Sequence, residues 1–149
     1  MRMTRRASGF TLSFLLFGVL SACGAGEAEP DAGSVVSCTK SQALQTLTSQ
    51  TGAYTFYVCD AATPARGFNT FSYLVVDKSG SPVDGLTFTV EPWMPDMNHG
   101  SPGTPAVAAY GDGLYQVSNV VFTMAGLWQL RTAVSAPTSD SANPQFNID

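Results

Sequence analysis

The chain has 149 residues, enough for one domain with extensions, and only 12% of them are charged. Its 14 Gly and 9 Pro, with 11% aromatic residues, favour short strands and many turns over helices. The formal net charge is −4, and residues 1–22 hold three of the 7 basic residues and none of the 11 acidic ones, so residues 23–149 carry 4 − 11 = −7. This charge argues against binding to nucleic acid and against electrostatic adhesion to an anionic membrane.

The N-terminal segment predicts export from the cytoplasm. Three arginines within residues 1–6 precede an apolar run over residues 10–20, which is too short to span a bilayer. The run ends in Leu-Ser-Ala-Cys at residues 20–23, which resembles a bacterial lipobox. We therefore expect residues 1–22 to be a lipoprotein signal peptide and Cys23 to be the lipidated mature N-terminus. The alternative is ordinary secretory cleavage, with Cys23 incidental.

A lipidated Cys23 would attach the protein to a membrane, because two or three acyl chains give stable anchoring where one does not. Gly24 follows, and the Asp that favours retention in the inner membrane is absent there. The expected location is therefore the cell envelope at the outer membrane, on its periplasmic or surface side. Residues 23–37, rich in Gly, Ala, Glu and Ser, predict a flexible tether. Residues 38–149 remain for the domain, with its core at about 52–149.

Cys38 and Cys59 are the two cysteines that lipidation leaves over. In an oxidising envelope they predict a disulfide. It would close a loop of about 22 residues and contribute about 3 kcal/mol in the chain-entropy model. The alternative is a pair of metal-binding thiolates, although neither cysteine has a His or another Cys at ligand spacing nearby.

Alternating apolar residues predict about seven to eight short antiparallel strands. The clearest has Leu86, Phe88 and Val90 on one face. A short helix is expected within residues 37–50 and a polar loop over 136–143. The strand count and spacing fit an immunoglobulin-like β-sandwich, and residues 112–117 resemble its tyrosine corner at Tyr115, one residue short in spacing. The expected strands are 54–58, 69–77, 86–91, 106–110, 114–118, 119–124, 127–134 and 145–148.

The stretch from Glu91 to Gly100 is expected to be a loop broken by prolines, and it holds the only histidine of the chain, His99. Met94, Met97 and His99 form the pattern Met-x-x-Met-x-His. Thioether sulfurs suit Cu(I), and imidazole suits either copper state. The pattern therefore predicts a copper site at these three residues. Met124, the remaining methionine after residue 22, is a weaker candidate ligand.

Each candidate ligand also has a structural interpretation. Met94 and Met97 are adaptable fillers that suit packing at one end of a sandwich. His99 can instead hydrogen-bond within a turn before Gly100, and Met124 follows buried-type residues at period two, which favours a place in the core. An enzyme is not expected, because the chain has one histidine, no free cysteine, no nucleophile elbow and no phosphate-binding glycine motif.

Several segments resemble YtkA-like and FixH-like domains in their order along the chain, over about residues 64–149. The resemblance implies a small β-sandwich that faces the envelope. The FixH branch is linked to assembly of copper-containing respiratory oxidases, and relatives occur beside metal-efflux components, which implies copper-handling or oxidase-assembly partners. FixH-type proteins are usually anchored by a membrane helix, whereas a lipid anchor is expected here, so the pathway role transfers less well than the family. The matching segments are PARGFNTF (64–71), DKSGSPV (77–83), WMPDMNHG (93–100), GLYQV (113–117) and VFTMAGLWQL (121–130).

Two functions remain open at this point. The first is a lipid-anchored envelope protein that binds or relays copper through Met94, Met97 and His99. The second is a non-catalytic immunoglobulin-like interaction or scaffold module of the envelope without a metal site. The first requires that the ligand atoms converge on a point that solvent can reach.

Overall fold

The computed structural model describes residues 36–60 and 62–149, and within these ranges every regular element is a strand. The expected signal peptide, the lipidated Cys23 and all but the last two residues of the tether lie outside the described residues. Among the residues that are described, no helix is long and apolar enough to cross a membrane.

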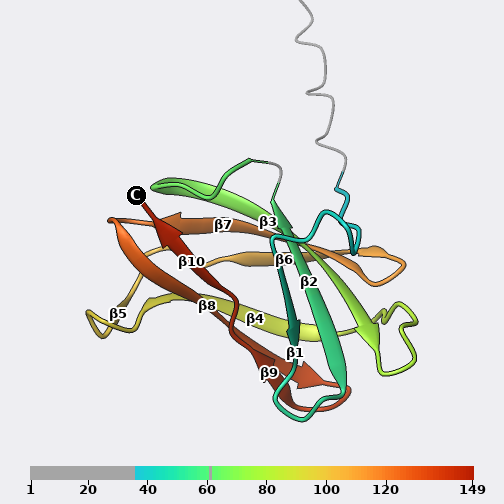
Figure 1. Ribbon diagram of the computed structural model, residues 1–149. Coiled ribbons are helices and arrows are strands. Elements are labelled where there is room, and N and C mark those ends of the chain that lie inside the picture. The colour runs from blue at the N-terminus through green and yellow to red at the C-terminus, as the bar shows by residue number, and fades with distance from the viewer. Residues whose placement is uncertain (1–35, 61) are drawn as a thin grey trace, which may run out of the picture. The chain divides into compact units, whose positions relative to one another are not determined.

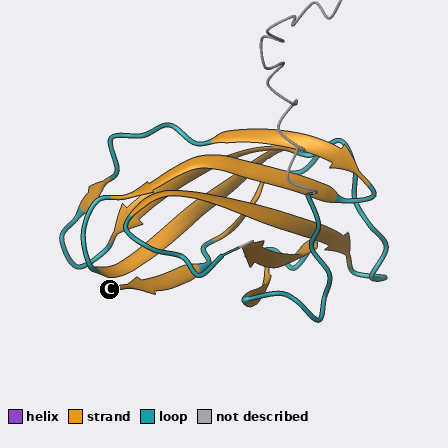
Figure 2. Ribbon diagram, turned by 90° about the horizontal axis from the view of Figure 1, so that it is seen from above, coloured by secondary structure: helices purple, strands orange, loops and turns teal. Residues whose placement is uncertain are grey.

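Two antiparallel sheets pack face to face as a β-sandwich (Figures 1 and 2). The predicted fold class is confirmed, although the described ranges hold ten strands instead of seven or eight. In spatial order, the first sheet contains β1 (Gln45–Thr48), β2 (Tyr54–Asp60), β3 (Gly67–Asp77), β7 (Leu114–Phe122) and β6 (Ala106–Gly111). The second contains β10 (Gln145–Ile148), β8 (Gly126–Ala136), β4 (Thr87–Met94) and β5 (His99–Gly100), with β9 (Asp140–Ala142) also paired to β8.

The core forms where the inward faces of the two sheets meet. Successive side chains of a strand point to opposite faces, so alternate residues are buried over residues 71–75 of β3 and residues 128–134 of β8. Tyr73 of the first sheet stacks on Phe88 of the second, with 6.0 Å between ring centroids. Phe122 and Trp128 lie 5.3 Å apart across the same layer. Such aromatic pairs contribute about 0.5–1.5 kcal/mol each beyond their area burial.

The N-terminal part of the domain differs from the sequence prediction. The helix expected within residues 37–50 is wrong, because Gln45–Thr48 pairs antiparallel with β2 as β1. The Leu44 amide also donates to the Val58 carbonyl at 2.8 Å. The local helical signal was weak, and the backbone edge of β2 offers hydrogen bonds and a packing surface that outweigh it. The loop expected over 136–143 likewise contains a short strand, β9.

The two strands predicted over 114–124 form one strand, β7, that ends at Phe122. Asn119 takes φ = 60° within it, a left-handed conformation that Asn tolerates better than most residues. Val120 and Phe122 are buried, but the chain turns after Phe122 and leaves the Met124 side chain 38% exposed. The interpretation that places Met124 in the core is therefore wrong.

Tyr115 ties β7 to the connection between β3 and β4. Its hydroxyl donates to the Val83 carbonyl at 2.8 Å and accepts from the Leu86 amide at 3.1 Å. A tyrosine corner bonds backbone only a few residues upstream, whereas these partners lie about 30 positions away, so the resemblance holds only in the use of a buried hydroxyl. Nearby, Gly113 has φ = +72°, and a Cβ there would lie 2.5 Å from the Val75 carbonyl oxygen, so the turn requires glycine.

The predicted disulfide between Cys38 and Cys59 is confirmed, with 5.6 Å between the two Cα atoms. It fastens the chain just before β1 to the end of β2. Because both sulfurs are used in the bond, the alternative of two metal-binding thiolates is wrong.

Candidate metal site

The stretch from Glu91 to Gly100 is a β-hairpin, which corrects the expected proline-broken loop. β4 continues through Pro92 to Met94, and the chain turns over residues 95–98 into β5. In an antiparallel strand the N and C=O of one residue point to the same neighbour. The Pro92 carbonyl accepts from the Ser101 amide at 3.1 Å, so its nitrogen faces away from β8, where no N–H is needed.

Met94 and His99 are direct partners across this hairpin. Side chains of such a pair lie on one face of the sheet, with Cβ atoms about 4.5–5.5 Å apart. That face is the inner one, because Met94 is only 3% exposed. Its methyl group fills the space over Gly126, where an added Cβ would lie 2.8 Å from Cε. Met94 is therefore held in one place by β4 and by the first residue of β8.

The His99 ring is half-buried and meets the Trp128 indole edge-on, with 6.3 Å between ring centroids. Its Nδ1 lies 3.0 Å from the Gly100 carbonyl oxygen. When Nδ1 carries the proton and donates to this oxygen, Nε2 keeps its lone pair. Metal-binding histidines use this arrangement, in which a hydrogen bond from one ring nitrogen fixes the tautomer and orients the other nitrogen.

Met124 lies in the turn between β7 and β8, beside the same tryptophan. The Trp128 indole N–H donates to the Met124 carbonyl at 3.0 Å. The side chains of Met94 and His99 and the backbone of Met124 thus meet at the first residues of β8. Met97 stands apart in the hairpin turn, where its side chain is 59% exposed.

The donor types at this end are thioethers and one imidazole. Among residues 36–60 and 62–149, no group of three or more His, Cys, Asp or Glu side chains is placed to hold a metal ion. Structural zinc and hard cations depend on thiolate, imidazole and carboxylate ligands in such numbers. A site built from thioether sulfurs with one imidazole suits soft Cu(I) instead.

Trp93 and Trp128 lie on opposite faces of the second sheet. The Arg131 guanidinium carbon lies 4.0 Å from the centre of the Trp93 ring on the outer face, near the exposed and weak ion pair of Arg131 with Glu91 at 3.9 Å. Trp128 is fully buried on the inner face beside His99. The site predicted from the sequence included neither Trp128 nor Gly126. The Met-x-Gly-x-Trp pattern at residues 124–128 was the available signal.

The fold and this end of the molecule define a class: a small all-β sandwich with methionines and a histidine gathered at one end. The family model for YtkA-like domains matches residues 44–133, which include the whole β4–β5 hairpin and all of β8 except its last three residues. The chain therefore belongs to the YtkA-like family. Searches among curated proteins and among solved structures returned no significant match.

Proposed function

We propose that this YtkA-like protein is a lipid-anchored domain of the bacterial cell envelope that binds Cu(I) at the end of the sandwich formed by the β4–β5 hairpin. In this role it carries or holds copper for another copper-handling protein and catalyses no reaction. The observation that carries the proposal is the cross-strand pairing of Met94 with His99 on the inner face, beside Trp128 and the Met124 turn.

The fixed positions of Met94 and His99 support selective binding. A ligand held by packing loses little conformational entropy on binding, and preorganised ligands bind more tightly. Methionine neither titrates nor forms disulfides, so it remains a usable copper ligand in an oxidising envelope, a location that the Cys38–Cys59 disulfide supports.

The exposure gradient among the candidate ligands supports a carrier role. Met94 is buried, His99 is half-buried, and Met124 and Met97 are progressively more exposed. A metal ion held by the buried residues could pass to another protein through the exposed thioethers of Met124 and Met97 without unfolding of the domain. Met97, in the turn, is the ligand best placed to meet an incoming or outgoing ion.

A second candidate function is a scaffold or interaction module without metal. The near-complete burial of Met94 and its contact with Gly126 favour it, because these are also the features of an adaptable core filler.

A competitive Cu(I) titration of residues 24–149, with the disulfide formed, decides between the two. Changing Met94, Met97 and His99 together to Ala should abolish stoichiometric binding. Because Met94→Ala also removes core volume, Met94→Leu is the sharper variant, since it deletes the sulfur at nearly constant volume. Asp96→Asn in the same turn is the control and should bind like the parent. Absence of binding in the parent, or equal binding in all variants, would support the scaffold function.

A further inference from the structure

The two sheets leave facing strand edges without partners on one side of the sandwich. β6 is the last strand of its sheet and pairs only with β7. β4 is paired with β8 along its length, but β5 reaches only Trp93 and Met94. Within the described residues, no strand pairs with the outer edge of β6 or with the β5-side edge of residues 87–91.

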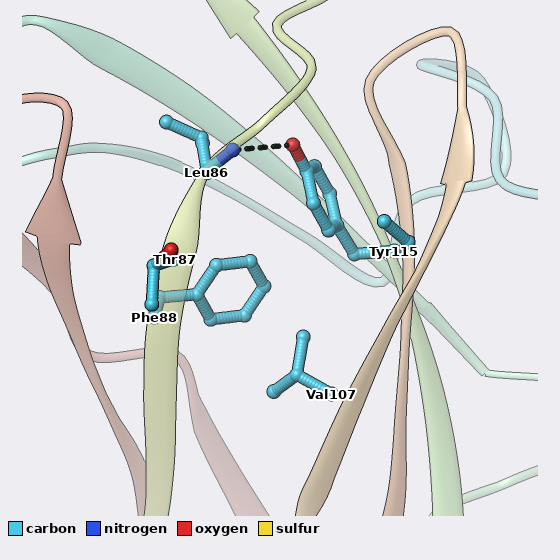
Figure 3. Close-up of a pocket in the computed structure, with 6 residues that line it drawn as sticks. Leu86, Thr87, Phe88, Val107 and Tyr115 are labelled. Atoms are coloured by element: carbon cyan, nitrogen blue, oxygen red, sulfur yellow. Dashed lines mark hydrogen bonds between the residues drawn. The ribbon is translucent and has the colours of Figure 1, made fainter.

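A pocket of about 230 Å³ opens between these two edges. Phe88 from β4 and Val107 from β6 point into the same space, and the Tyr115 ring closes one side (Figure 3). The Tyr115 hydroxyl is already bonded to Val83 and Leu86, so the pocket offers an apolar wall between two backbone edges. We call this region the β4–β6 slot; its lining residues are Leu86, Thr87, Phe88, Val107, Ala109 and Tyr115.

The β6 edge has only part of the usual protection against strand pairing, a register shift between Ala109 and Gly111. Natural edge strands carry charges, prolines or bulges that prevent another strand from adding. β6 reads Ala-Val-Ala-Ala-Tyr-Gly, without a charge or a proline, and its register with β7 shifts only at its C-terminal end. The edge is therefore competent to pair with a further strand.

We propose that the β4–β6 slot is a docking site for an extended segment of a partner protein, which adds a strand to β6 and places one apolar side chain in the pocket. Unpaired N–H and C=O groups along an edge require a ligand with a peptide backbone, and pockets for alternate side chains supply the selectivity in this mode of recognition. A lipid chain or a free hydrocarbon would fill the pocket and leave the edge unpaired.

The charges around the slot define the partner further. The Asp84 carboxylate accepts from the Gly113 amide at 2.8 Å, which holds it beside Asp112 at the C-terminal end of β6. The chain has no Lys or Arg between Lys78 and Arg131. The preferred segment therefore carries a basic residue beyond its apolar centre. A second copy of this acidic chain would bring like charge to the interface.

The test uses the mature chain, residues 23–149 with Cys23→Ser, and the probe peptide Lys-Thr-Val-Thr-Leu-Thr-Val-Thr-Lys. Amide hydrogen exchange followed by NMR should show slowing at the outward-facing amides of residues 106–110, which alternate with those directed at β7. The slowing should be roughly fivefold or more for each backbone hydrogen bond gained, at about 1 kcal/mol apiece. The same peptide with Glu at both ends should bind more weakly, and one with Gly at its centre should also bind more weakly.

Two matched variants complete the design. Ala109→Phe fills the pocket and should abolish protection by the peptide, whereas Ala108→Phe makes the same change one residue away, outside the pocket lining, and should retain it. Equal binding by both variants, or no protection at millimolar peptide, would overturn the proposal. Protection of β6 without peptide, with a dimer in analytical ultracentrifugation, would overturn it in favour of a second copy. The Gly-centred peptide tests the pocket even if Ala109→Phe fails to fold.

Discussion

The two lateral sides of the sandwich differ in whether hydrogen bonds link the strand edges of the two sheets. On the side of β1, β9 and β10, side chains and backbone bridge the two sheets. The Gln145 amide donates to the Gln45 side-chain oxygen at 2.9 Å, and the Gln45 side-chain nitrogen donates back to the Gln145 carbonyl. The Gln50 amide donates to the Ser141 carbonyl at 2.8 Å. On the side of β4 and β6, the edges face the β4–β6 slot instead.

The difference shows that the hydrogen bonds of one side chain can cover a strand edge. The Gln45 side chain carries one donor group and one acceptor, as a peptide unit does, so a single residue satisfies the edge backbone that another strand would otherwise pair with. The side chains of β6 are those of three alanines, one valine and one tyrosine, and the Tyr110 hydroxyl is bonded to Gln116 on the neighbouring strand of the same sheet. Within the described residues, no β6 side chain therefore bridges to the edge of β4. Hydrogen bonds therefore join the two sheets on the closed side of β1, β9 and β10, whereas the edges of β4 and β6, on the open side, stay available to a ligand.

The largest expected effect comes from removing the disulfide that supports the closed side. Changing Cys38 and Cys59 together to Ala should lower the free energy of unfolding by about 3 kcal/mol, because the unfolded chain regains the entropy of the open loop. Urea denaturation measures this change, and the reduced parent protein should match the double variant. An unchanged denaturation midpoint would show that β1 and its hydrogen bonds hold this side without the disulfide.

On the open side, Tyr115→Phe should cost about 2 kcal/mol, because the Leu86 amide and the Val83 carbonyl each lose a partner in a poorly hydrated place. Thermal and urea unfolding measure the loss. Tyr110→Phe is the matched control, since Tyr110 is exposed and its hydroxyl bonds only to Gln116, and it should change stability by less than about 0.5 kcal/mol. Equal effects of the two variants would mean that the Tyr115 hydroxyl does not stabilise the rim of the slot.

The smallest effect is expected at Asp140, on the closed side, and it depends on pH. Burial raises the pKa of this carboxyl, but hydrogen bonds from Ser49, Thr51 and Ser141 together lower the pKa well below its ordinary value. A lowered folded-state pKa gives stability that is present above the unfolded pKa of about 4 and is lost as the pH falls below it. Asp140→Asn should therefore flatten the fall of the melting temperature in acid, and Thr51→Ala should give an intermediate slope. A slope identical to that of the parent would contradict this account.

The faces of the strands could be predicted from the sequence, because the period of two is a local property. Leu86, Phe88 and Val90 are buried as their spacing predicted, and the disulfide was predicted from the number of cysteines and the expected compartment. β1 could not be predicted, because its stability comes from the β2 edge instead of its own residues. Pro92 was misread as a breaker, because the sequence does not reveal which side of a strand a proline nitrogen will face.

The candidate site was predictable as a set of donor types but not as an arrangement. Met94 and His99 are five residues apart, and only the pairing of β4 with β5 places them opposite each other. Trp128 and Gly126 come from a strand more than 25 residues further along the chain, so their contacts with His99 and Met94 depend on the sandwich itself. Met124 was misplaced because the alternation was extended past the end of β7.

The position of the Met94 methyl group depends on a residue that is not among the proposed ligands, Gly126. Gly126 has φ = +129°, and any side chain there would meet the methyl group of Met94. Met94 can keep its observed position only because Gly126 has no side chain. Under the proposed Cu(I) function, a side chain at residue 126 would displace the Met94 methyl group and strain the backbone, and would therefore weaken metal binding without removing a donor atom.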